Sequence, residues 1–136
     1  MCLKLETQAK DGKLEIYTST VTFTECVWIK GNPNKLSRQH EAVLQKYFMH
    51  KYLKIVICDR QIAEAARLLI WDYPSLRPKD AIHVASAMAQ QIEEFHSYDS
   101  DHIKLDGKLG TSPLKICNPQ VIPPAPSSQG NLILPN

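Results

Sequence analysis

The sequence predicts an α/β protein in which a mostly parallel sheet lies between two layers of helices. Short apolar segments with strand character, at 14–19, 52–58 and 93–98, alternate with amphipathic helical segments. Strands joined by helical crossovers run parallel, and right-handed crossovers place helices on the faces of the sheet. We therefore expect a three-layer α/β/α fold.

The composition is that of a globular domain. The chain has 136 residues, of which 43% are hydrophobic and 22% charged, enough for one domain with its own core. We expect this domain over residues 1–118 and a disordered or loosely attached tail over 119–136, which holds five of the nine prolines. No apolar run reaches the roughly 20 residues that cross a bilayer, and no signal-peptide pattern is present. We therefore expect no membrane association and a cytoplasmic location.

The charge and the cysteines narrow the function only a little. A formal net charge of +2 neither supports nor excludes binding to nucleic acid. The four cysteines are widely spaced and include no C-x-x-C pair, which argues against a zinc knuckle or a disulfide framework. We expect reduced thiols that are mostly buried.

The first quarter of the chain predicts a helix, a strand and a second helix. Residues 1–13 read as the end of a helix, because the Asp11-Gly12 pair is a stop signal. The strand at 14–19 follows. Ser19 or Thr20 can then cap a helix that reaches Trp28.

The middle of the chain predicts a helix, a buried strand and another helix. Ser37 is a suitable cap for a helix over 37–51. Residues 52–58 are continuously apolar at their centre, as in a strand of a parallel sheet that is buried on both faces. Asp59 can cap the following helix, which Tyr73-Pro74 ends.

In the last third of the chain, carboxylates lie at the start of a predicted helix and at the end of a predicted strand. Pro78 suits the first turn of a helix, and Asp80 lies among the free amides at the positive end of its dipole. After a short strand at 93–98, Asp99 and Asp101 lie where a strand gives way to a loop. The proline-flanked segment 113–119 predicts a final strand.

These acids, together with Glu25, can meet at one edge of the sheet, because the carboxyl ends of parallel strands share an edge. Two carboxylates about 5 Å apart repel by about 3 kcal/mol at an effective dielectric near 20, so a cation must offset them. Oxygen ligands favour Mg²⁺ or Mn²⁺, and such ions can activate water for hydrolysis of a phosphodiester. The sequence contains no G-x-S-x-G elbow, Walker A loop, G-x-G-x-x-G or H-E-x-x-H motif.

Three segments resemble the successive motifs of the PIN-domain family, in order and spacing, over most of residues 10–118. The segments are Ile16 to Glu25, Asp80 to Ala87, and Ser97 to Asp101. By this resemblance Glu25, Asp80 and Asp99 match the second, third and fourth acidic positions, which are catalytic and bind the metal. Asp101 matches an auxiliary metal-binding acid, and Ser19 and Ser97 match supporting hydroxyl positions.

The resemblance implies a function, partners and a cofactor. PIN domains are metal-dependent ribonucleases, and many are VapC-like toxins of toxin–antitoxin pairs. We therefore expect an endoribonuclease that uses Mg²⁺ or Mn²⁺, takes RNA as substrate, pairs with an antitoxin protein and forms a homodimer. The alternatives are a catalytically inactive PIN-like module that binds RNA or an antitoxin-type partner, and another metal-dependent phosphohydrolase on a similar sheet.

The sequence departs from the family pattern at its start. The family's first acid ends an opening strand that is central to the sheet, and nothing before residue 14 resembles that strand. Asp11 is no substitute, because it lies in a helix-ending turn. We expect that Met1 lies downstream of the true start of the protein; the alternative is a truncated form that lacks this acid.

The acidic residues and histidines also have simpler explanations. Asp80 could serve only to interact with the helix dipole, and Glu25 could be a solvated helix residue. Asp99 and Asp101 could simply cap a loop. We expect His83 and His96 to be packed or hydrogen-bonded structural residues, because an oxygen site for magnesium has little use for imidazole.

Overall fold

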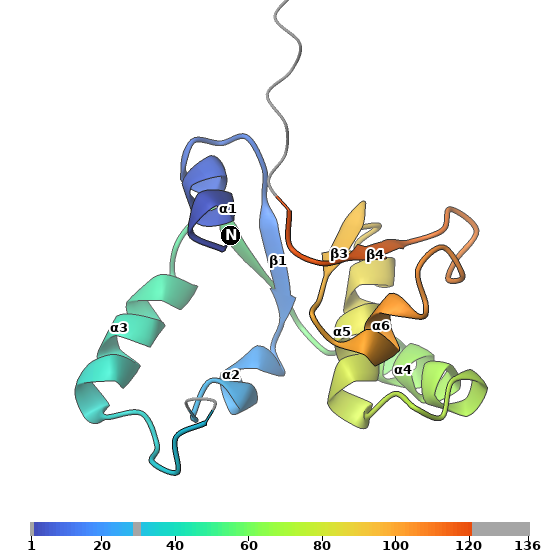
Figure 1. Cartoon of the computed structure of the whole chain (residues 1–136), viewed down its shortest axis with the longest axis horizontal. Helices are drawn as coiled ribbons and strands as arrows, with labels where there is room; N and C mark the ends of the chain where they lie inside the picture. Colours follow the sequence, from blue (N-terminus) through green and yellow to red (C-terminus); the bar gives the residue numbers. More distant parts are fainter. Residues whose placement is uncertain (1, 29–30, 121–136) are drawn as a thin grey trace, which may run out of the picture.

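The structure, a computed structural model, describes residues 2–28 and 31–120 (Figure 1). The predicted tail therefore lies almost wholly outside the described residues. The helices and strands in chain order are α1 (Cys2–Lys10), β1 (Ile16–Ser19), α2 (Thr22–Glu25), α3 (Arg38–Phe48), β2 (Leu53–Val56), α4 (Arg60–Asp72), α5 (Pro78–Ala89), β3 (Glu94–His96), α6 (Ser100–Ile103) and β4 (Lys115–Cys117).

The strands form two parallel pairs. β1 pairs with β2, from Ile16 opposite Leu53 to Ser19 opposite Val56, and β3 pairs with β4 in the same parallel sense. Helices α1 and α3 lie on one side of the β1–β2 pair and α4 and α5 on the other (Figure 1). The α/β class is confirmed, but over the described residues the sheet consists of two separate two-stranded parts.

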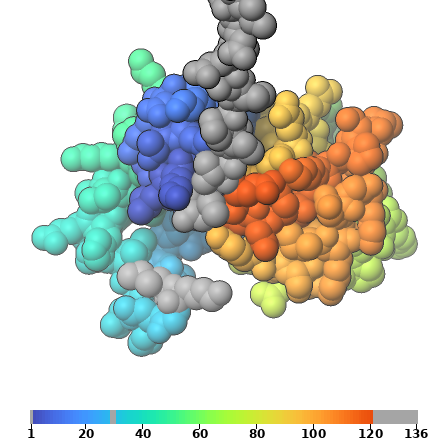
Figure 2. Space-filling view, turned by 45° about the horizontal axis from the view of Figure 1, so that its top comes forward, coloured from blue at the N-terminus to red at the C-terminus, as the bar shows by residue number. Residues whose placement is uncertain are grey.

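The core is built around α5. Ala81 and Val84 have no exposed surface and Ala85 is nearly as buried, so α5 is covered along one side by α4 and β1. Small side chains at these positions let the neighbouring backbones approach closely. In Figure 2 the segments around β3, α6 and β4 gather on one side of the molecule, away from α3. Helix α5 thus lies between the core and the segments that carry the acidic residues.

Several helix boundaries follow the predicted local signals. The Ser37 hydroxyl accepts a hydrogen bond from the backbone N–H of His40, and the Asp59 carboxylate accepts one from Ile62. These side chains satisfy amides that have no partner inside the helix. Helix α4 ends directly before Tyr73-Pro74, as expected.

Two predictions were wrong: the length of α2 and the burial of β2. Helix α2 is a single turn that stops at Glu25, because the chain turns at Cys26 and Trp28 instead forms an antiparallel bridge to Lys35. Strand β2 is not buried on both faces: Lys54 is exposed, and Ile57 beyond the strand is 71% exposed. The helices therefore cover β2 less completely than its apolar run predicts.

Candidate functional site

Asp80 lies in the first turn of α5, which Pro78 opens. Its carboxylate is mostly buried, with 18% of the side chain exposed, and one oxygen lies 3.9 Å from Nε2 of His102. The positive end of the helix dipole favours an anion here. The helix start that the sequence predicted for Asp80 is confirmed.

Glu25 is joined to the same helix by two hydrogen bonds. Its Oε1 accepts from Nζ of Lys79 at 2.7 Å, and its Oε2 accepts from Nε2 of His83, also at 2.7 Å. Burial raises the pKa of Glu25, but the hydrogen bonds from Lys79 and His83 outweigh it and hold this pKa below its usual value. Glu25 is therefore an ionised, partly buried carboxylate beside the first turns of α5.

A chain of hydrogen bonds orients His83. A carboxylate can only accept, so the bond to Glu25 requires the proton on Nε2 of His83, and in the neutral ring Nδ1 is then an acceptor. The Ser19 hydroxyl lies 3.1 Å from Nδ1 and donates to it, while its oxygen accepts from the backbone N–H of Val21. Ser19 thus fixes the imidazole that holds Glu25. A hydroxyl at the end of β1 is thereby linked, through His83, to an acid on α2.

The same arrangement recurs at the end of β3. Oγ of Ser97 accepts from the backbone N–H of Asp99 and lies 2.7 Å from Nδ1 of His102. The Nε2 of His102 faces Asp80 and is a buried nitrogen without a hydrogen-bond partner among the described residues. Each predicted serine therefore lies at the end of a strand, Ser19 as its last residue and Ser97 directly after it, and contacts a histidine whose other nitrogen faces a predicted acid.

Asp99 and Asp101 belong to α6, a short helix that the sequence did not predict. Asp99 is its N-cap, and Oδ1 accepts from the backbone N–H of Asp101 at 2.8 Å. The Asp101 carboxylate in turn accepts from Nζ of Lys104. Asp99 therefore caps a helix and not the loop considered for it, and this role occupies one of its two carboxylate oxygens.

The acids converge on the start of α5 without forming a closed set of ligands. Glu25 contacts α5 directly, and α6, which Asp99 caps, brings His102 to Asp80. Among the described residues, no three of the predicted acids place ligand atoms within 4.8 Å of one another. Their oxygens are nevertheless the donors that Mg²⁺ or Mn²⁺ prefers, and the Lys79 ammonium already occupies a cation position on Glu25. The chemistry of the donors therefore suits such an ion, whereas their spacing over the described residues is more open than that of a closed site.

Nucleophilic catalysis by the Ser19–His83–Glu25 chain does not fit the structure. Such a serine must reach its substrate, whereas Ser19 is 1% exposed. The three residues instead form a rigid support for the carboxylate.

Two residues of this site were missed from the sequence, Lys79 and His102. Lys79 directly precedes Asp80 in the first turn of α5, so its position in the sequence was a signal that it lies near the site. His102 lies three residues after Asp99, a helical spacing that carries information only once α6 is known. His83 is hydrogen-bonded through both ring nitrogens, as expected.

The fold and the site define an α/β domain with acidic side chains gathered at the start of a buried helix. A family model described as PIN domain matches residues 4–108, and the chain belongs to the PIN-domain family. PIN domains are generally nucleases that act on RNA and typically bind divalent metals. No curated protein and no solved structure matched the chain. Within the described residues, no helix has the length and apolar character needed to span a membrane.

Proposed function

We propose that this chain is a metal-dependent endoribonuclease that hydrolyses RNA phosphodiester bonds. In this proposal Glu25, Asp80 and Asp99 hold Mg²⁺ or Mn²⁺, and Asp101 assists. The observation that carries it is the paired support of Glu25 and Asp80, each faced by a histidine that a strand-end serine contacts. A side chain that hydrogen-bonds a carboxylate, as His83 does for Glu25, orients it for a metal.

The residues of the chain have defined tasks in this reaction. A bound Mg²⁺ or Mn²⁺ ion supplies an activated water and offsets the charge on the leaving oxygen. His83, positioned by Ser19, keeps the Glu25 carboxylate in one orientation. The α5 dipole favours the ionised form of Asp80. Lys79 neutralises Glu25 in the structure and would be displaced by a metal cation that binds this carboxylate.

We further propose that the chain acts in the cytoplasm as the toxin of a toxin–antitoxin pair, as a homodimer that an antitoxin protein inhibits. The support for this part is the resemblance of its three motifs to VapC-like PIN domains. Separate tests apply here. Sedimentation measures the oligomeric state, and expression of the wild-type chain in a bacterial host should arrest growth while Asp80→Asn should not.

Cleavage of a structured RNA during a Mn²⁺ titration tests the nuclease activity. We expect Mn²⁺-dependent cleavage that Asp80→Asn abolishes and that Asp72→Asn leaves unchanged. Asp72 is the matched control, because it is an exposed aspartate at the end of α4. Circular dichroism should show that both variants fold. Wild-type turnover in Asp80→Asn would mean that the metal site has been misplaced.

A second candidate is a catalytically inactive PIN-like module that binds RNA or an antitoxin-type protein. It is favoured by the Lys79 ammonium on Glu25 and by the open spacing of the acids over the described residues. This module would retain RNA in a gel-shift assay at any Mn²⁺ concentration without producing fragments. Fragments that depend on Mn²⁺ and on Asp80 exclude it.

A further inference from the structure

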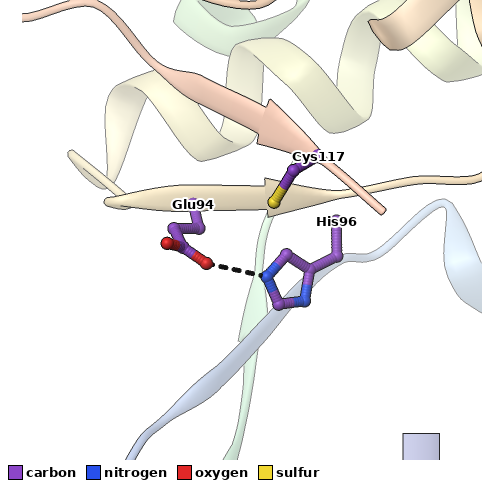
Figure 3. A group of neighbouring side chains, drawn as sticks. All are labelled: Glu94, His96 and Cys117. Carbon is purple, nitrogen blue, oxygen red and sulfur yellow. Dashed lines mark hydrogen bonds and ion pairs between the residues drawn. The ribbon is translucent and has the colours of Figure 1, made fainter. Parts of the chain in front are cut away.

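A second group of possible ligands lies on the β3–β4 pair. Glu94 and His96 alternate with Phe95 on β3, so they share one face of the strand while Phe95 packs on the core. Cys117 lies opposite His96 in the parallel register. Figure 3 shows the three side chains pointing toward one another. One donor atom from each residue lies within 4.8 Å of the other two.

This spacing is close to that of a tetrahedral metal site. Metal–ligand bonds of about 2.0–2.3 Å imply neighbouring donor atoms about 3.3–3.8 Å apart. Oε2 of Glu94 and Nε2 of His96 are already 3.0 Å apart, and the sulfur of Cys117 lies within the 4.8 Å limit. Side-chain rotations alone, without movement of the strands, can separate Glu94 and His96 to this spacing.

These three donors favour a different ion from the one that the acids around α5 favour. A thiolate, an imidazole and a carboxylate together suit Zn²⁺ or Co²⁺, whereas Mg²⁺ prefers oxygen alone. The three residues are partly buried and come from a strand pair fixed by backbone hydrogen bonds. The group is therefore more ordered than a chance gathering of surface side chains.

Neighbouring residues form hydrogen bonds with two of the three side chains, Glu94 and Cys117. Lys115 binds Oε1 of Glu94, which leaves Oε2 directed at His96, and Gln120 donates to the Cys117 sulfur at 3.5 Å. Hydrogen bonds from Lys115 and His96 lower the pKa of Glu94 to about 2. Burial, followed by the charge of Glu94, raises the pKa of the Cys117 thiol. Metal binding therefore releases the thiol proton and places a cation between two anionic ligands.

We propose that Glu94, His96 and Cys117 bind a divalent ion of the Zn²⁺ class, with the fourth position open to water or a ligand. The ion links β3 to β4 through His96 and Cys117, directly before the turn that carries Ser97 and Asp99. This site is separate from the acids around α5 and does not depend on the proposed nuclease activity.

Co²⁺ is the probe, because a cobalt–thiolate bond gives a charge-transfer band in the near-ultraviolet and tetrahedral Co²⁺ gives visible absorption. We expect the wild-type chain to show both on titration. Cys117→Ser should lose the charge-transfer band, and His96→Asn should weaken Co²⁺ binding at least 10-fold. Cys58→Ser is the matched control, since Cys58 is also partly buried but lies outside the group. Asp80→Asn should leave the spectrum unchanged.

Thermal unfolding gives a second readout, because an ion that binds only the folded chain raises its midpoint. We expect Zn²⁺ to raise the melting temperature of the wild type and of Cys58→Ser but not of Glu94→Gln or His96→Asn. The absence of a charge-transfer band in the wild type would overturn the proposal. So would a band that persists in Cys117→Ser, or an equal thermal shift with Zn²⁺ and Mg²⁺.

Discussion

Replacing Ser19 by alanine tests the support of Glu25. The hydroxyl is almost fully buried and makes two hydrogen bonds, one to His83 and one from the Val21 amide. Each bond contributes about 0.5–1.5 kcal/mol net, and a buried partner left without one costs more. His83 keeps 18% of its side chain exposed and can be partly rehydrated. We therefore expect Ser19→Ala to lower the free energy of unfolding by about 2 kcal/mol.

Ser86→Ala is the matched control for this measurement. Ser86 is equally buried, but its hydroxyl donates to the Ile82 carbonyl, which lies inside α5. Because alanine favours a helix and that carbonyl keeps its helical bond, we expect a change below about 0.5 kcal/mol. Urea unfolding compares the two, and at about 3–5 °C per kcal/mol the melting temperature of Ser19→Ala should fall by about 6–10 °C.

The Ser19 variant also has a functional readout. Without Ser19, His83 is free to rotate away from Glu25, so Mn²⁺ affinity should fall about 10-fold, as when other residues that orient metal ligands are changed. Ser86→Ala should keep wild-type Mn²⁺ affinity. Equal unfolding midpoints for Ser19→Ala and Ser86→Ala would refute the reasoning, because the serine would then only fill space.

Three further predictions follow from single contacts. Asp106→Ala leaves the buried Ile116 amide without the acceptor that it has at 2.7 Å, so urea unfolding should show a loss of about 1–3 kcal/mol; Asp106→Asn keeps the acceptor oxygen and should lose clearly less. Lys79→Met removes the ammonium from Glu25 and should raise Mn²⁺ affinity in a calorimetric titration; a lower affinity would show that Lys79 does not compete with the metal. The folded pKa of Glu94 is about 2, below its usual 4.5, so its stabilisation is complete above pH 4.5 and is lost as the pH falls toward 2. In Glu94→Gln the urea-unfolding midpoint should depend less on pH between about 2 and 4.5. The same pH dependence as in the wild type would contradict the lowered pKa of Glu94.

Local signals explain which parts of the fold could be predicted from the sequence. Pro78 and the apolar spacing of α5 lie within one helix, so that helix and the place of Asp80 were predicted correctly. The caps Ser37 and Asp59 were predicted for the same reason, because each bonds an amide three residues away.

Other features depend on contacts between distant segments. Helix α6 has only four residues, too few for a periodic pattern. The group of Glu94, His96 and Cys117 exists only through the register of β3 against β4, which no local signal determines. The hydrogen bond between Ser19 and His83 joins residues 64 positions apart. The resemblance assigned Ser19 a supporting role, and its partner became visible only in the fold.

In the proposed nuclease, the acids around the start of α5 hold the ion that the reaction uses. Mn²⁺ binding and RNA cleavage, measured on the same samples of wild type, Asp80→Asn and Asp72→Asn, test it most directly. We predict that the wild type and Asp72→Asn bind Mn²⁺ and cut RNA, and that Asp80→Asn loses both properties while remaining folded. Cleavage by the wild type in the presence of a chelator, or Mn²⁺-dependent cleavage by Asp80→Asn, would contradict the account.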